Sequence, residues 1–203
     1  MKTVQRNGES IKVKDVYKEC PILENDRFLI RLITREDAAD LFKVYGDKMA
    51  LPFFNSDNCH GTNFYCATRE MVAESIYYWL KEYAEGGFVR FTIVDKAERA
   101  AVGTIELFNR RAEDYFDDCG LLRLDLRTDY ENSRDIASIL SIITEPAFDL
   151  FHCSMIATKA PIYAVDRREA LEAAGYGLSE ECLIGSQDHK AYDGYWVKKR
   201  SVE

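Results

Sequence analysis

The sequence of 203 residues has no long apolar run and no cluster of basic residues. A membrane-spanning helix needs about 18 consecutive apolar residues, and residues 1–16 lack the apolar core of a signal peptide. The 27 Lys and Arg stand against 35 Asp and Glu, so the net charge of -8 repels phosphate backbones. We therefore expect a cytoplasmic protein that binds neither membranes nor nucleic acids.

Paired cysteine motifs are also absent. The six cysteines are scattered, and we expect them to be thiols of the core in a reducing compartment. The tightest group, Cys59 and His60 with Cys66, lacks the C-x-x-C spacing with which a short loop wraps zinc. We expect a loop that merely contains these residues, and no metal.

Internal repeats, low-complexity tracts and linkers rich in Pro, Gly or Ser are missing as well. With 47% hydrophobic residues, the chain is long enough for one domain with a sizeable core. We expect residues 27–203 to form that domain. Residues 1–26 are expected to be an N-terminal arm or to add an edge strand over 11–19.

Hydrophobic periodicity then predicts an α+β element order. Alternation predicts a strand over 28–34, and the Thr-Arg-Glu-Asp that follows opens a helix. A second helix over 68–83 has Thr68 as N-cap and a Gly86-Gly87 stop. Further elements are strands over 88–94, 101–109 and 121–127, a helix over 133–151 kinked or broken at Pro146, a strand over 154–159, a helix over 165–174, and closing strands near 183 and 192–198.

This order resembles the GNAT superfamily of acyl-CoA N-acyltransferases, in the branch of the ribosomal-protein N-acetyltransferases. Three stretches within 27–200 carry the resemblance: FLIRLITREDAADLF, FTIVDKAERAAVGTIELFN and ATKAPIYAVDRREALEAAGYGLSEE. The resemblance implies a GNAT fold, with a central mixed, mostly antiparallel sheet of about seven strands flanked by helices. It also implies an acyltransferase with acetyl-CoA as co-substrate and no metal.

The family pairs the pantetheine arm with the edge of its fourth strand and rests the pyrophosphate on the amides that begin the next helix. Helix N-termini hold phosphate because their first N–H groups are unpaired. Here the resemblance places pantetheine along Leu124, Leu126 and Arg127. It places the pyrophosphate on the turn that follows, which consists of Asn132, Ser133, Arg134, Asp135, Ile136 and Ala137.

That turn departs from the family pattern of Arg or Gln, two residues, Gly, one residue, then Gly or Ala. Ala137 fits the last small position, but Asn132 replaces the Arg or Gln and Asp135 replaces the first Gly. A second register puts Arg134 at the first Gly position. A carboxylate of Asp135 that faces the site would repel phosphate, whereas one that faces outward would leave the amides free.

Candidate catalytic residues are few. Glu106 on the third strand is the expected general base, and Tyr195 is a substitute for the Tyr acid of the family, whose position falls on Leu171 here. The Asn of the family falls on Ala164. His60 is a second candidate base in the aromatic loop 51–67, which is expected to line the acceptor site.

The expected reaction is direct transfer of an acetyl group to a primary amine, either a small molecule or a peptide N-terminus. A homodimer stays open. Two alternatives also stay open: a non-catalytic GNAT-like module that binds a ligand or a partner, motivated by the unusual loop, and an unrelated α+β domain. The unrelated domain would show no splay between the fourth and fifth strands.

Overall fold

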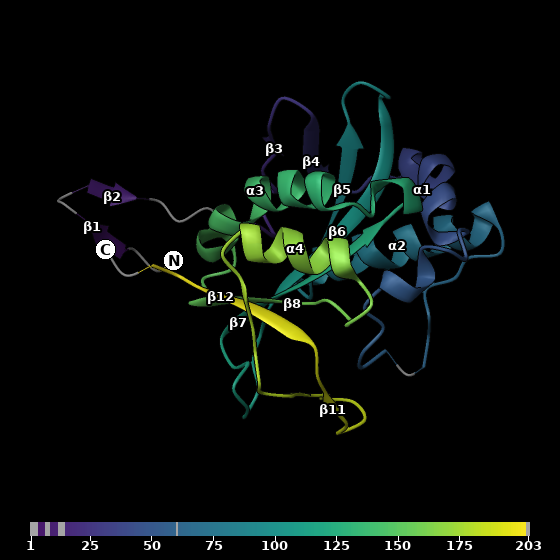
Figure 1. Cartoon of the computed structure of the whole chain (residues 1–203). Helices are drawn as coiled ribbons and strands as arrows, with labels where there is room; N and C mark the ends of the chain where they lie inside the picture. The colour runs from purple at the N-terminus through teal and green to yellow at the C-terminus, as the bar shows by residue number, and fades with distance from the viewer. Residues whose placement is uncertain (1–3, 7–8, 12–14, 60, 202–203) are drawn as a thin grey trace.

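One eight-stranded sheet forms the centre of the computed structural model, which describes residues 4–6, 9–11, 15–59 and 61–201 (Figure 1). Its strand order is β3-β4-β5-β6-β7-β8-β12-β9. All neighbours are antiparallel except β7 and β8. The strands are β3 (Leu23–Glu24), β4 (Phe28–Leu32), β5 (Val89–Asp95), β6 (Ala100–Arg110), β7 (Cys119–Leu126), β8 (Met155–Lys159), β9 (Gly177–Leu178) and β12 (Tyr195–Lys199).

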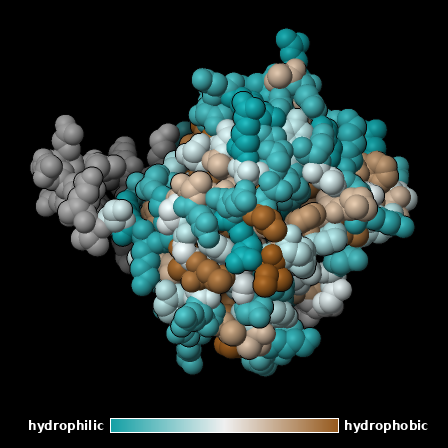
Figure 2. Space-filling model, viewed as in Figure 1, coloured by the Kyte–Doolittle hydropathy of each residue, from teal (hydrophilic) through white to brown (hydrophobic). Residues whose placement is uncertain are grey.

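Helices cover both faces of this sheet. The pair α3 (Ser133–Leu150) and α4 (Val165–Ala173) lies side by side on one face, and α1 (Ala38–Tyr45) and α2 (Arg69–Glu85) lie against β5 and β6 on the other (Figure 1). The outer surface on the α3 and α4 side is mostly hydrophilic, with small separate hydrophobic groups (Figure 2). Short 3-10 turns complete the helical elements: η1 (Arg35–Asp37), η2 (Leu51–Phe53) and η3 (Thr128–Tyr130).

Alternation along β5, β6 and β7 gives the sheet two unlike faces. The face under α3 is apolar and includes Phe91, Ile105 and Leu124 in the main core. The face toward α1 carries charged and polar side chains that are nevertheless buried: Arg90, Thr92, Thr104, Glu106 and Asp125. Buried charges are costly unless they are paired, so this polar face needs a dense set of internal contacts.

Local sequence signals hold the elements that flank this face. The Thr68 side chain accepts a hydrogen bond from the Met71 N–H at 3.3 Å, and Gly86 ends α2 with a φ of 78°. Gly103 allows β6 to approach β7 closely, since a Cβ at Gly103 would lie 2.4 Å from the Asp125 carbonyl oxygen. The predicted N-cap and stop of α2 are both confirmed.

The structure corrects three predictions. Helix α3 does not break at Pro146 but continues to Leu150, because its packing in the core offsets the one backbone hydrogen bond that a proline cannot donate. The edge strand that residues 1–26 add is β3 at 23–24 and does not lie over 11–19, where residue 11 ends β2 (Glu9–Ile11), residues 15–19 form a turn and residues 12–14 lie outside the described ones. The predicted closing strands are three rather than two: β10 (Leu183–Ile184) and β11 (Ala191–Tyr192) form a separate hairpin, and β12 joins the large sheet. A second separate hairpin consists of β1 (Val4–Arg6) and β2.

The predicted α+β fold with a mixed, mostly antiparallel sheet is confirmed. Within the described residues, no helix is both long and apolar enough to span a bilayer.

Candidate functional site

The parallel pair β7 and β8 separates partway along its length. The two strands pair from Cys119 with Met155 to Leu122 with Thr158. Strand β7 then continues to Leu126 with no strand on that side among the described residues. Because Arg127 N–H donates to Val102 on the β6 side, the backbone groups of Leu124 and Leu126 face the opening. The sheet therefore has the splay that would be absent from an unrelated α+β domain.

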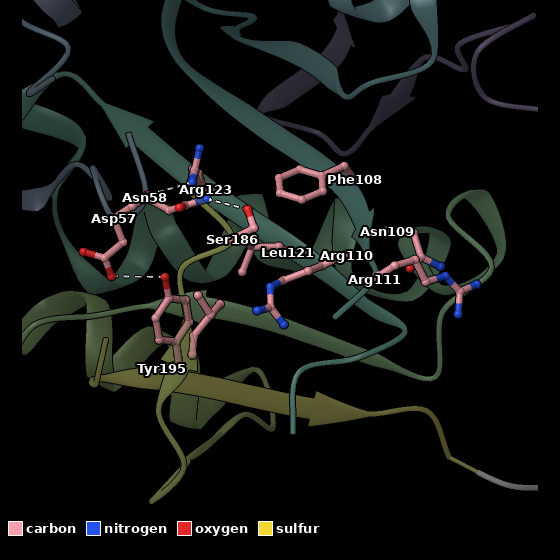
Figure 3. A pocket seen from close by; sticks show the side chains of 11 residues that line it. Asp57, Asn58, Phe108, Asn109, Arg110, Arg111, Leu121, Arg123, Ser186 and Tyr195 are labelled. Carbon is pink, nitrogen blue, oxygen red and sulfur yellow. Dashed lines mark hydrogen bonds between the residues drawn. The ribbon is translucent and has the colours of Figure 1, made fainter. Parts of the chain in front are cut away.

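A polar group lies where the two strands part. Tyr195 begins β12, next to β8, and its hydroxyl donates to Asp57 Oδ2 at 3.1 Å (Figure 3). Asn55 Nδ2 donates to the same hydroxyl at 3.2 Å, and Lys159 Nζ contacts Asp57 Oδ2 at 2.6 Å. Burial, followed by the charge of Asp57, raises the pKa of Tyr195 well above its usual value. Tyr195 thus holds its proton at neutral pH.

Glu106 lies in the buried polar face rather than on an exposed strand surface. One carboxylate oxygen contacts Arg123 Nη1 at 2.8 Å and the other accepts from Arg90. Arg90 also contacts Asp125 at 3.1 Å, and burial raises the pKa of Asp125. Two cations and two anions balance this cluster, so its charges remain paired away from water.

Arg123 connects this cluster to the tyrosine. Its second terminal nitrogen donates to the Asp57 backbone carbonyl at 2.9 Å. Glu106 and Tyr195, the two predicted catalytic residues that the structure describes, therefore lie at opposite ends of one chain of contacts through Arg123 and Asp57. Sequence reasoning missed both linking residues. Asp57 lies in the aromatic loop that was expected near the acceptor, which was the available signal.

Cavities run along this chain of contacts. The small one of Figure 3, about 160 Å³, includes Asp57, Arg123 and Tyr195. It shares Asn58, Phe108, Arg123 and Ser186 with a cavity of about 760 Å³, which we term the aromatic cavity. The aromatic cavity lies between α2, β5, β6 and the 58–66 loop, and its lining includes Phe64, Tyr65, Tyr78, Trp79, Phe88 and Phe108.

His60 lies outside the described residues. Among the residues that are described, no three His, Cys, Asp or Glu side chains come together in a way that could hold a metal ion.

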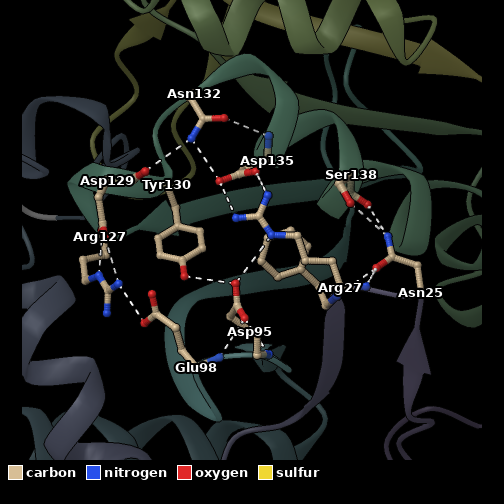
Figure 4. Close-up of polar contacts among 12 residues, drawn as sticks. Asn25, Arg27, Asp95, Glu98, Arg127, Asp129, Tyr130, Asn132, Asp135 and Ser138 are labelled. Atoms are coloured by element: carbon tan, nitrogen blue, oxygen red, sulfur yellow. Dashed lines mark hydrogen bonds and ion pairs between the residues drawn. The ribbon is translucent and has the colours of Figure 1, made fainter.

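The Asp135 carboxylate faces Arg27, which precedes β4. It accepts from both terminal nitrogens of Arg27, at 3.0 Å for Nη2, and from Asn132 Nδ2 at 3.0 Å (Figure 4). Arg27 also contacts Asp95, which accepts from Tyr130. Asp135 is 4% exposed and neutralised by Arg27. Its charge therefore belongs to a contact between α3 and the edge of the sheet.

Two of the first amides of α3, those of Ser133 and Asp135, are occupied by side-chain oxygens of the chain itself. Asn132 Oδ1 accepts from the Asp135 N–H at 3.0 Å, and the Ser133 N–H donates to Asp166 Oδ1 at 3.2 Å. Arg134 is exposed, while Ile136 is fully buried in the core. Arg127 pairs with Asp129 and Glu98 at the surface.

The unpaired edge of β7 is occupied as well. Arg167 from α4 donates to the Leu124 carbonyl at 2.9 Å and to the Phe53 carbonyl at 3.0 Å, and it forms an ion pair with Glu131. In this conformation the chain's own side chains occupy the Leu124 carbonyl and two amides at the start of α3, where the resemblance places pantetheine and the pyrophosphate. Sequence reasoning missed Glu131, Asp166 and Arg167, although Glu131 directly precedes the turn at 132–137.

The splayed sheet with α3 launched from β7 defines the fold of the GNAT-family acetyltransferases, and the resemblance is confirmed at the level of fold. No family model matches the sequence, and no curated protein matches it.

Solved structures carry the likeness. An acetyltransferase of the GNAT family from Bacillus anthracis has a TM-score of 0.62 at 13% identity, with 88% of this chain and 98% of that chain covered. The ribosomal-protein-S5-alanine acetyltransferase from Vibrio fischeri has 0.59 at 15%, with 88% and 96% covered. A Salmonella typhimurium acetyl transferase, described as modifying the N-terminal serine of a 50S ribosomal subunit protein, has 0.63 at 10%, with 89% and 100% covered.

Proposed function

We propose that the protein is an acyltransferase that moves an acyl group, acetyl in the simplest case, from acyl-CoA to a primary amine. The observation that carries this proposal is the unpaired edge of β7, which opens beside Tyr195 and Asp57. These two residues line the small cavity that shares part of its lining with the aromatic cavity. The acetyltransferase neighbours support it through their shared fold. Acyl-CoA would supply the activated acyl group, and side chains of this chain would bind the acceptor and move the protons.

The proposed acceptor is a cationic amine, carried on a small molecule or at a peptide N-terminus. Two carboxylates of α2, Glu74 and Glu82, line the aromatic cavity, whereas Glu106 in the same lining is already paired with Arg90 and Arg123. Carboxylates near an apolar wall attract an ammonium group, and aromatic rings bind the attached carbon skeleton.

Tyr195 is the proposed proton donor for the leaving thiolate. A tyrosine hydroxyl carries its proton at neutral pH, and Asp57 and Asn55 orient that of Tyr195. Glu106 is the proposed proton acceptor, with Arg90 and Arg123 fixing its position. His60 remains a candidate base that a substitution can test.

Two measurements test the proposal. Calorimetric titration with acetyl-CoA should detect binding, and release of the CoA thiol should require an added amine. No binding at millimolar acetyl-CoA would refute an acyl-CoA enzyme.

Substitutions then test the two residues. Tyr195→Phe and Glu106→Gln should each lower kcat by about 100-fold, the scale of acid–base catalysis. Tyr115→Phe, at an exposed ring, should leave kcat unchanged. A wild-type kcat in all three variants would show that neither Tyr195 nor Glu106 transfers a proton in the reaction.

The occupied groove favours a second candidate, a non-catalytic module that binds a ligand in the aromatic cavity. Amines that bind this cavity in a protein that does not bind acetyl-CoA would support the module instead.

A further inference from the structure

Arg167 is one side chain that ties together three walls of the β7 opening. It contacts the Leu124 carbonyl of β7, the Phe53 carbonyl of the loop after α1, and Glu131 just before α3. Arg167 is 3% exposed, and the Glu131 side chain is 4% exposed. A guanidinium in this position makes the hydrogen bond to Leu124 that a ligand extended along β7 would need.

Asp166, the residue before Arg167, covers the N-terminus of α3. Asp166 is exposed, and its carboxylate accepts from the Ser133 N–H at 3.2 Å. Helix N-termini attract anions, so this carboxylate holds a place that a phosphate oxygen could take. The first turn of α4 therefore covers both the strand edge and the helix start.

The segment that leads into α4 adds another link. The Tyr163 hydroxyl donates to the Pro52 carbonyl at 2.6 Å, and its ring lies 6.2 Å from the ring of Phe53. The loop after α1 is thus joined to the region around α4 by Tyr163 as well as by Arg167. Both sides of the opening are held by contacts from one short segment.

We infer that the start of α4, through Asp166 and Arg167, is an internal lock that closes the acyl-CoA groove and must open before the cofactor binds. The inference rests on the proposed function and adds a regulatory step to that same site. Opening exchanges Asp166 for a phosphate oxygen at the Ser133 amide. It also withdraws Arg167 from Leu124, whose carbonyl then becomes available to an extended ligand.

The lock has a measurable consequence for affinity. The apparent Kd equals the intrinsic Kd divided by the fraction of molecules that are open. If roughly one molecule in ten or fewer is open, complete release of the lock tightens cofactor binding at least tenfold. A variant that disturbs only an unrelated surface ion pair has no such effect.

The experiment titrates CoA into four proteins and measures each Kd by calorimetry. Glu131→Gln removes the charge that holds Arg167, and Asp166→Ala frees the Ser133 amide. Asp149→Asn is the matched control, because it breaks the exposed ion pair with Arg200 at the far end of α3. Circular dichroism and thermal melting establish that each variant is folded.

We expect Glu131→Gln to bind CoA at least tenfold more tightly than the wild type, Asp166→Ala about threefold more tightly, and Asp149→Asn within twofold. Should Glu131→Gln fail to fold, Asp166→Ala decides alone, since Asp166 is exposed. Equal affinities in all four proteins would overturn the lock and leave the proposed function standing. Tighter binding in the two lock variants without transfer to any amine would support the lock and refute the proposed function. If none binds CoA, both fail.

Discussion

Two arginine–carboxylate contacts flank the start of α3, and they differ in what they join. On one flank, Arg27 from the edge of the sheet binds Asp135 inside the helix. On the other, Arg167 from α4 binds Glu131 ahead of the helix and reaches across the β7 opening. The first contact holds α3 to the sheet, whereas the second also occupies the backbone that a cofactor would use. An arginine–carboxylate ion pair therefore holds α3 in place on one flank and occupies the proposed cofactor groove on the other.

The largest expected effect is on the Arg27 flank. Asp135→Ala should lower the free energy of unfolding by about 2 kcal/mol, because it removes a buried carboxylate that binds Arg27 and Asn132, while Arg27 keeps its contact with Asp95. Urea denaturation measures the loss. Asp149→Asn, at an exposed pair, should lower it by about 1 kcal/mol or less.

The Asp135→Ala variant also tests the comparison of the two flanks through its affinity for CoA. Since the Asp135 carboxylate faces Arg27, its removal should change the Kd for CoA by less than about twofold, against the tenfold change expected for Glu131→Gln. A large gain of affinity in Asp135→Ala would show that this carboxylate does oppose phosphate, and the two flanks would no longer differ.

A smaller effect is expected at Asn132, which caps α3. Its Oδ1 accepts from the Asp135 N–H and its Nδ2 donates to the Asp135 carboxylate. Asn132→Ala should therefore lower the free energy of unfolding by about 1 kcal/mol.

Asn132→Ser is the matched variant for the cap. It keeps a capping oxygen and loses the amide donor to the Asp135 carboxylate and the Asp129 carbonyl, so it should recover most of the stability, as urea denaturation would measure. An Asn132→Ser variant as unstable as Asn132→Ala would place the effect in the bond to Asp135 instead of in the cap.

Sequence patterns predicted the fold because its signals are local. Alternation, the Thr68 cap and the Gly86 stop each depend on a few neighbouring residues, and each recurs in the structure. Gly103 is similar, since the strand pairing that it permits lies within one hairpin register.

The site was less predictable because its contacts are distant in sequence. Glu106 and Tyr195 came from strand positions, but the partners that connect them, Arg123 and Asp57, come from elements far apart in the chain. The direction of the Asp135 carboxylate depended on Arg27, which lies 108 residues away. The sequence of the turn points to Asp135 as the obstacle to phosphate, whereas the contacts that occupy the groove come from α4.

The smallest expected effect separates the flanks by their response to acid. Burial alone would raise the pKa of Asp95, but the amides of Glu98 and Ala97, Tyr130 and Arg27 hold the pKa below its usual value of 3.8. Asp95 thus stabilises the Arg27 flank above pH 3.8, and that stability is lost as pH falls through its lower folded pKa.

On the other flank, burial raises the pKa of Glu131 above its usual 4.5 despite Arg167. The folded protein then takes up a proton that the unfolded chain does not, so this contribution to stability increases as pH falls through the folded pKa toward 4.5.

Thermal denaturation of the wild type and Glu131→Gln between pH 7 and pH 4.5 measures this difference. The stability of the wild type relative to Glu131→Gln should increase on acidification, by about 1.4 kcal/mol for each unit by which the pKa is raised. The stability of the wild type relative to Asp95→Asn should show no such gain between pH 7 and pH 4.5, because the Asp95 carboxylate titrates below that range. Parallel curves for the wild type and Glu131→Gln would mean that Glu131 is no harder to ionise in the folded protein than in the unfolded chain. The groove flank would then respond to pH in the same way as an ordinary surface ion pair.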